Sequence, residues 1–193
     1  GNHEVKALRG DLKYVTKNYF KLAEILSLNV RDLYLEDTFW GRWLRSKNVI
    51  TKIGDILFVH GGIHPDILLK DYSVSEINDI MRKNIDLSLE EIKMDTTLSF
   101  LFRKNGPIRF RGFFRPDSLP EISSDQLSTI LNHFKVEKLI VGHTTHDHII
   151  AINNNRLTGA DGGIKRGRGG EGLIIDNGCY FCTNAKGGIT RVF

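Results

Sequence analysis

The sequence contains few cysteines, few prolines and no long hydrophobic stretch. Two cysteines and four prolines among 193 residues exclude a small disulfide-stabilised protein and a proline-rich disordered chain. No run approaches the roughly 18 apolar residues that a transmembrane helix needs, so we expect no membrane partner. A content of 40% hydrophobic and 26% charged residues is typical of a soluble globular protein, and we predict a single domain over residues 1–193.

The two cysteines, Cys179 and Cys182, lie three positions apart in a segment with the composition of a strand. Because side chains alternate along a strand, the two would lie on opposite faces of a sheet and would not form a disulfide with each other. We predict reduced thiols that take no part in catalysis. The compartment stays open between the cytoplasm and the periplasm.

Basic residues exceed acidic ones only slightly, and the formal net charge is +4. The sharpest basic stretch is Lys-Arg-Gly-Arg-Gly-Gly at 165–170. It carries no aromatic side chain on which a nucleic-acid base could stack. We therefore expect a glycine-rich loop between strands and no nucleic-acid partner.

Hydrophobic spacing predicts the first elements of the chain. Residues 19–26 carry an apolar stripe at positions i, i+3, i+4 and i+7, which predicts a helix that covers part of the core. The aromatic cluster at 39–44 predicts a second helix. After a glycine-containing turn, the continuous apolar run 56–59 predicts a strand buried on both faces.

Three serines begin capping boxes in the middle of the chain. Ser73, Ser88 and Ser123 are each followed three residues later by Glu or Gln. In this arrangement the hydroxyl accepts a backbone hydrogen bond and the longer side chain reaches back to the serine N–H. We predict a helix after each serine, and the helix after Ser88 is expected to continue to Phe102.

The last third of the chain changes to short apolar runs separated by polar or glycine turns. These runs predict successive strands at 138–142, 148–152, 172–176, 179–181 and 188–192. A turn that tolerates positive φ joins two of them at 176–178. Helices that precede strands, with a strand–helix–strand core between them, predict a mixed α/β sheet structure.

Several histidines stand where ligands collect in α/β proteins. His60 and His143 follow predicted strands in glycine-flanked turns, and His3 lies in a similar glycine-led motif. Carboxyl ends of strands project side chains into one crevice, and imidazole with a carboxamide oxygen suits Mn, Fe or Zn. His133 is expected at the surface of its helix. For His64, a place beside the site and a plain loop position both stay open.

Three motifs occur in a specific order: Gly-Asn-His-Glu at 1–4, His-Gly-Gly at 60–62 and Gly-His-Thr at 142–144. Together they resemble the calcineurin-like metallophosphoesterases. The stretches Gly-Asp-Leu-Lys-Tyr-Val at 10–15 and Gly-Pro-Ile-Arg-Phe-Arg-Gly at 106–112 look like the bacterial branch of the Shewanella-like protein phosphatases. The resemblance implies a four-layer fold, in which a mixed β-sheet sandwich is flanked by helices.

The resemblance also implies a two-metal phosphoester hydrolase. In that case Asn2, His60 and His143 would ligate one cation, through an amide oxygen and two imidazole nitrogens. His3 would protonate the departing oxygen, and Arg111 would hold the non-bridging oxygens of the phosphate with its planar fork. Two cations about 4 Å apart would activate a bridging water for in-line attack.

Two further residues are weaker candidates. The resemblance places a second histidine two positions after His143, where this sequence has Thr145, so His146 has only a weak claim to the other metal. Asp161, between glycines, is a candidate for orienting a ligand histidine, although turn chemistry explains it equally well.

The family's Asp-x-His and Gly-Asp-x-x-Asp-Arg-Gly stretches do not occur in these residues. We therefore expect a chain that starts inside a longer protein and represents the C-terminal portion of one calcineurin-like domain, with a helical insertion around residues 66–116. Without an anionic bridging ligand, it would hold at most one weakly bound cation and show little activity. Exposed strand edges would favour self-association.

The resemblance predicts a phosphoprotein phosphatase that acts on phosphotyrosine or phosphoserine/threonine, or on small phosphoesters. A dinucleoside polyphosphate hydrolase is an alternative, because it shares the same metal motifs. A degenerate, non-catalytic domain that binds an anionic partner through residues 165–170 is another alternative.

Overall fold

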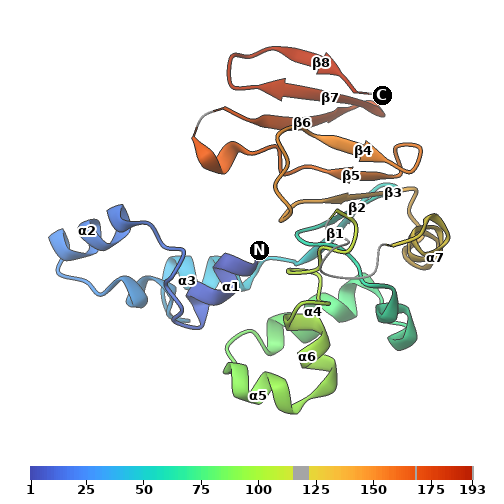
Figure 1. The fold of residues 1–193 in the computed structure, drawn as a ribbon. Coiled ribbons are helices and arrows are strands. Elements are labelled where there is room, and N and C mark those ends of the chain that lie inside the picture. The colour runs from blue at the N-terminus through green and yellow to red at the C-terminus, as the bar shows by residue number, and fades with distance from the viewer. Residues whose placement is uncertain (115–121, 168, 193) are drawn as a thin grey trace.

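The computed structural model describes residues 1–114, 122–167 and 169–192, and these form two β-sheets with helices along the chain (Figure 1). The first sheet has the strand order β1-β2-β3-β5-β4, and the second has the order β6-β7-β8. In the first sheet β2, β3 and β5 run parallel, while β1 and β4 pair antiparallel at its two edges. The strands are β1 (Ile50–Ile53), β2 (Ile56–Val59), β3 (Lys138–Val141), β4 (Ile150–Ile152), β5 (Leu157–Gly159), β6 (Glu171–Asp176), β7 (Cys179–Asn184) and β8 (Ile189–Arg191).

Helices occupy most of the first two thirds of the chain, and Figure 1 shows α1–α3 projecting to one side of the sheets. The α-helices are α1 (Asn2–Leu8), α2 (Lys17–Ile25), α3 (Phe39–Arg45), α4 (Val74–Lys83), α5 (Leu89–Met94), α6 (Thr96–Phe102) and α7 (Ser124–Phe134). The 3₁₀ helices are η1 (Val30–Tyr34), η2 (Pro65–Lys70) and η4 (Ile164–Arg166). No described helix is long and apolar enough to cross a membrane.

The predicted burial of 56–59 on both faces is confirmed, and it explains the layering. Leu57 and Val59 belong to a large cluster with buried residues of α4–α7. Ile56 and Phe58 point the other way, into a smaller cluster that includes Tyr180 of the second sheet. Each fully buried aliphatic side chain of this kind contributes about 1.5–3 kcal/mol. The result is the predicted mixed α/β fold, with helices on one face of the first sheet and the second sheet on the other.

The local signals identified most elements correctly. All three capping boxes form, at Ser73, Ser88 and Ser123. The turn between β6 and β7 has positive φ at Asn177 and Gly178, as expected. Both cysteines are free thiols, which confirms that they do not pair. The helices between 65 and 102 lie within the segment that we predict to be an insertion.

Two expectations about helices are wrong. The helix after Ser88 does not continue to Phe102, because Asp95 adopts an extended conformation and caps a new helix by accepting a hydrogen bond from the Leu98 N–H. The apolar stripe of 19–26 does not cover the core: Tyr19 and Leu22 are about half exposed, and Ala23 is the buried residue of α2.

Sequence analysis did not predict two of the strands. β1 reads Ile-Thr-Lys-Ile and β5 only Leu-Thr-Gly, so neither has an apolar run of its own. Their pairing with β2 and β3 makes them strands. The basic stretch at 165–170 begins in η4, and its glycines at 167, 169 and 170 belong to no helix or strand. One of its charged residues, Arg168, lies outside the described residues.

Asn78 joins α4 to β1 and the residue before it through three hydrogen bonds, two of which are buried. Its Oδ1 accepts from the backbone N–H groups of Val49 and Ile50 at 2.9 and 3.2 Å, and its Nδ2 donates to the Ile50 carbonyl at 2.8 Å. The side chain is 5% exposed. The Asn78 side chain therefore supplies hydrogen-bond partners for backbone groups of Val49 and Ile50 at the outer edge of the sheet, which no neighbouring strand of the described chain pairs with.

We expect the substitution Asn78→Leu to lower the free energy of unfolding by about 3 kcal/mol, because each buried backbone group left without a partner costs about 1–3 kcal/mol. Urea unfolding measures this as a lower midpoint with an unchanged slope. The exposed Ser75→Ala on the same helix serves as the control and should change stability by less than about 0.5 kcal/mol. Equal midpoints for the two variants would contradict the role assigned to Asn78.

Candidate active site

His60 and His143 emerge beside each other at the carboxyl edge of the first sheet. Val59, the last residue of β2, pairs with Val141, the last residue of β3, in parallel register. The next hydrogen bond continues the ladder, from the Gly142 N–H to the His60 carbonyl at 2.9 Å. Parallel strands end at the same edge, so the two imidazoles are brought together and their ring centroids are 4.9 Å apart.

Asn2 joins this pair from the N-terminal end of α1. Its Oδ1 lies 2.9 Å from His60 Nε2, although 58 positions separate the two residues along the chain. Asn2 is 8% exposed, which makes it one of few buried polar side chains. The structure thus brings together Asn2, His60 and His143. Asn2 and His3 both lie in the first turn of α1.

The backbone of His143 is held in an unusual conformation. His143 has φ of 64°, in the left-handed region that a residue with a Cβ rarely adopts. Thr144 behind it is buried, and Arg111 Nη1 donates to the His143 carbonyl at 2.8 Å. Strained residues persist where surrounding contacts over-determine them, and they cluster at functional sites.

Arg111 reaches the site because its loop approaches the end of β2 closely. The Gly61 N–H donates to the Pro107 carbonyl at 2.6 Å. A Cβ at Gly61 would lie 2.8 Å from the Arg109 backbone nitrogen, closer than a side chain tolerates. Glycine at 61 therefore allows residues 106–111 to lie against the strand end, which positions the Arg111 guanidinium beside His143.

Both imidazoles are neutral near pH 7. Burial lowers the pKa of His60 to about 4. Burial, followed by the positive charge of Arg111, lowers the pKa of His143 to about 3. Neutral imidazoles have a free lone pair for a cation. Two of them with a carboxamide oxygen form the neutral N/O donor set that borderline divalent metals accept.

The donor set is small in the part of the chain that the structure describes. No three His, Cys, Asp or Glu side chains within it form a group that could hold a metal. Asn2, His60 and His143 are a different kind of set, since one of the three contributes an amide oxygen. They fit one cation, and they supply no negative charge to balance it.

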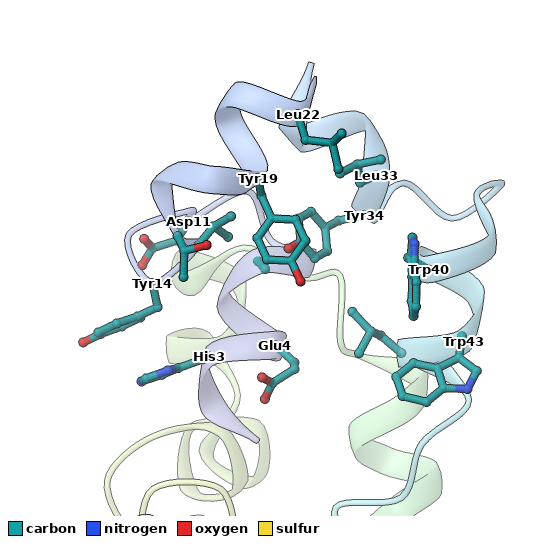
Figure 2. Close-up of a pocket in the computed structure, with 14 residues that line it drawn as sticks. His3, Glu4, Asp11, Tyr14, Tyr19, Leu22, Leu33, Tyr34, Trp40 and Trp43 are labelled. Atoms are coloured by element: carbon teal, nitrogen blue, oxygen red, sulfur yellow. The ribbon is translucent and has the colours of Figure 1, made fainter. Parts of the chain in front are cut away.

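His3, the next residue of α1, lines a large aromatic pocket (Figure 2). Its ring stacks on Tyr14, with centroids 3.7 Å apart and an interplanar angle of 3°. The pocket has a volume of about 530 Å³. Its other aromatic walls are Tyr19, Tyr34, Trp40 and Trp43.

This aromatic pocket explains why α2 and α3 expose large apolar side chains. Trp40 and Trp43 are about half exposed and contact each other edge to face, on the wall opposite His3. Sequence analysis identified both tryptophans only as helix residues. The apolar stripe that contains Tyr19 was interpreted as core packing, whereas Tyr19 lines the pocket.

The weaker candidates have structural partners. Asp161 Oδ2 accepts from the Thr145 hydroxyl at 2.9 Å, and its carbonyl accepts from the His146 N–H at 2.8 Å. His146 packs edge to face on Phe114. Asp161 contributes a favourable charge to protonated His60, so it lies near the cluster.

Two other histidines, His64 and His133, have structural contacts away from the cluster. His64 caps η2 by accepting from the Asp66 N–H, which favours the loop position. His133 is not a plain surface residue, because its Nε2 lies 3.0 Å from the Tyr72 carbonyl and its side chain is 19% exposed.

The lowered pKa values of His60 and His143 predict loss of stability in acid for the metal-free protein. Below pH 6.5 the unfolded chain protonates both residues, whereas the folded protein does so only near pH 4 and 3. We expect the urea midpoint, measured in chelator, to fall as the pH drops from 6.5 to 4. The double variant His60→Gln/His143→Gln should show a shallower fall, and equal slopes would refute this assignment.

A sequence model described as calcineurin-like phosphoesterase matches residues 1–147. Among solved structures, the cold-active protein-tyrosine phosphatase of a psychrophilic Shewanella species is 36% identical, with a TM-score of 0.90. A 1.1 Å structure of a cold-active protein tyrosine phosphatase is also 36% identical, with a TM-score of 0.89. No curated protein matches the chain.

These structures cover 100% of this chain, whereas the chain spans 57% and 56% of theirs. The matched region includes the strand ends that carry His60 and His143, together with the helix that carries Asn2 and His3. The extent of the match and the identity over the full chain show that this chain belongs to the calcineurin-like phosphoesterase family.

Proposed function

We propose that the protein is a metal-dependent phosphomonoesterase that removes phosphate from phosphorylated proteins, with phosphotyrosine as the preferred substrate. The observation that carries this proposal is the convergence of Asn2, His60 and His143, with Arg111 beside them, at one edge of the sheet. The similar solved structures are named as protein tyrosine phosphatases.

Asn2, His60 and His143 would hold one divalent cation, which we propose to be Mn, Fe or Zn. A bound cation of this kind supplies a Lewis acid that neutralises phosphoryl charge and lowers the pKa of the attacking water. Because all three side chains are neutral, residues 1–193 by themselves are expected to bind at most one such ion, and only weakly. Asp161 would act near the site only through its charge, since its carboxylate is bonded to Thr145.

Arg111 would hold the non-bridging oxygens of the phosphate. Its Nη1 is bonded to the His143 carbonyl at 2.8 Å and lies 3.3 Å from the Thr144 hydroxyl. These contacts orient the planar guanidinium before the substrate arrives, which reduces the entropy lost on binding. The fork geometry matches a phosphate in a way that a lysine ammonium does not.

His3 would donate the proton that the departing oxygen needs. It is adjacent to Asn2 in sequence and is exposed, so its imidazole is accessible to a leaving group. Burial of part of the ring lowers the pKa of His3 from the ordinary value, so the negative charge of a bound phosphate would have to favour the protonated imidazole that donates. Stacking on Tyr14 fixes the plane of the ring, which supports general-acid catalysis by holding the imidazole in one orientation.

The aromatic pocket supports a phenol as the leaving group. It opens beside His3 and is walled by tyrosine and tryptophan rings (Figure 2). Aromatic pairs prefer stacked or edge-to-face contacts and gain about 0.5–1.5 kcal/mol beyond area burial. A phosphotyrosine ring would gain such contacts, whereas a phosphoserine side chain has no ring to offer.

We expect His3→Asn to lower kcat by 10²-fold to 10⁴-fold, the usual contribution of a general acid. Hydrolysis of p-nitrophenyl phosphate and of a phosphotyrosine peptide by the full-length protein measures this, with added Mn²⁺ and with chelator as the metal-free control. His133→Asn is the matched control and should leave kcat unchanged, because His133 lies on α7 and contacts the Tyr72 carbonyl. Unaltered kcat in His3→Asn would rule out the proton-donor role.

We expect Trp43→Ala to raise KM for a phosphotyrosine peptide by about tenfold, since removing an aromatic contact of this size costs about 1–1.5 kcal/mol. The matched phosphoserine peptide should show a change of less than twofold. Exposed Leu69→Ala, on η2 and outside the pocket lining, is the control. If both peptides lose equally, the pocket does not select the aromatic ring.

A further inference from the structure

A basic groove of about 900 Å³ begins at Asn2 and His143 and continues along α1 toward the ends of α5 and α6. Its lining contains six lysine and arginine residues and two acidic ones, so the groove as a whole is positively charged. The two acidic side chains already have cationic partners: Asp11 is bonded to Lys6 at 2.6 Å, and Glu90 lies 4.0 Å from Lys93. The groove is therefore suited to an anion.

Arg9 is fixed in this groove. Its Nε donates to the Ile85 carbonyl at 2.7 Å, and its guanidinium carbon lies 4.5 Å from the centre of the Phe102 ring. These two contacts determine where the guanidinium lies. Its Nη2 is buried and, among the residues that the structure describes, has no hydrogen-bond partner. A preformed donor is thus present without an acceptor.

Arg109 presents a second donor of the same kind. Its Nε is also buried and finds no acceptor within the described ranges. Arg109 is close enough to repel Arg9: burial and then the charge of Arg109 lower the pKa of Arg9 to about 10, while Asp86 acts in the opposite direction. The Asp86 carboxylate is itself paired with Arg45. Two cations held together with unsatisfied N–H groups are unfavourable unless an anion lies between them.

The position of this pair relates it to the candidate active site. Arg111, Asn2 and His143 line the same groove. Asp11 and Tyr14 line both this groove and the aromatic pocket. A ligand that extends from the aromatic pocket past Tyr14 therefore enters the basic groove without leaving the protein surface.

We propose that Arg9 and Arg109 bind a second anionic group of the phosphorylated polypeptide substrate, a carboxylate or a second phosphate, beside the phosphate that is removed. This inference rests on the proposed phosphatase function. A guanidinium binds either anion through paired, charge-assisted hydrogen bonds. A polypeptide is favoured because one segment can place an aromatic ring in the pocket and an acidic side chain in the groove that adjoins it.

The test compares four substrates of the full-length protein. These are p-nitrophenyl phosphate, a phosphotyrosine peptide with neutral neighbours, the same peptide with glutamates beside the phosphotyrosine, and the same peptide with phosphoserine there instead. We expect kcat/KM for the two acidic peptides to exceed that for the neutral peptide by tenfold or more at low salt. The two acidic arms distinguish a carboxylate from a second phosphate.

Arg109→Gln and Arg9→Gln should each bring this ratio close to one, mainly through KM. Arg109→Glu should reverse the preference toward a peptide with lysines beside the phosphotyrosine. Arg82→Gln is the matched control: it removes the same charge from α4, outside the groove lining, and should leave the ratio unchanged. Circular dichroism melting confirms that each variant is folded, and Arg109→Gln carries the test if Arg9→Gln unfolds.

The outcomes separate this proposal from the proposed function. If p-nitrophenyl phosphate and the neutral peptide are not hydrolysed, the phosphatase function fails. If both are hydrolysed but acidic neighbours give no advantage, the second anion site is wrong and the phosphatase function stands. An equal loss on all substrates in Arg109→Gln would show a purely structural role. A diadenosine polyphosphate hydrolysed in preference to the acidic peptides would overturn the assignment to a polypeptide.

Discussion

The parallel pairing of β2 with β3 is the constraint on which the site depends. It makes Val59 and Val141 end at the same level of the sheet, and the ladder continues by one more bond between His60 and Gly142. The following residue, His143, has to turn through a left-handed conformation to bring its ring toward His60. In β2, Leu57 packs against the helices and Ile56 packs against the second sheet. The strand that carries His60 at its end is therefore packed on both of its faces.

Electrostatics gives the two sides of α1 different properties. Asn2 faces neutral imidazoles and a set of arginines, whereas His3 faces tyrosine and tryptophan rings. Consecutive residues on one helical turn thus contact two different environments. The arginines lower the pKa of His143 further, which keeps its lone pair available to a cation. The candidate site therefore combines neutral donor side chains with cationic side chains.

The similarity to protein tyrosine phosphatases and the chemistry of the pockets support each other. An aromatic pocket beside a candidate proton donor and a basic groove beside the candidate metal ligands are what the proposed hydrolysis of an aryl phosphate in a polypeptide requires. Most of the pocket residues come from the region between α1 and β1. This region contributes little to the main core: Val5 of α1 is the buried residue before β1 that belongs to it.

Local signals in the sequence were sufficient for some of this. The capping boxes at Ser73, Ser88 and Ser123 and the apolar run 56–59 act through neighbouring residues, and all of them form as predicted. The motifs around Asn2, His60 and His143 named the residues that the structure brings together, because each motif follows or begins an element. The capping of α6 by Asp95 is also a local interaction. It was not predicted, because apolar residues on both sides of Asp95 suggested one continuous helix.

Long-range contacts decided the rest. Sequence alone determined which residues carry donor atoms and which segments are helices or central strands, since these depend on chemistry and short-range periodicity. Arg9 is seven residues after Asn2, which is about two helical turns, and that relation is visible in the sequence. Its proximity to Arg109, 100 positions away, results only from folding. The exposed stripe of α2 likewise becomes a pocket wall only when Trp40 and Trp43 face it. Tertiary structure decided these features because the energy of each contact depends on a partner that no local pattern encodes.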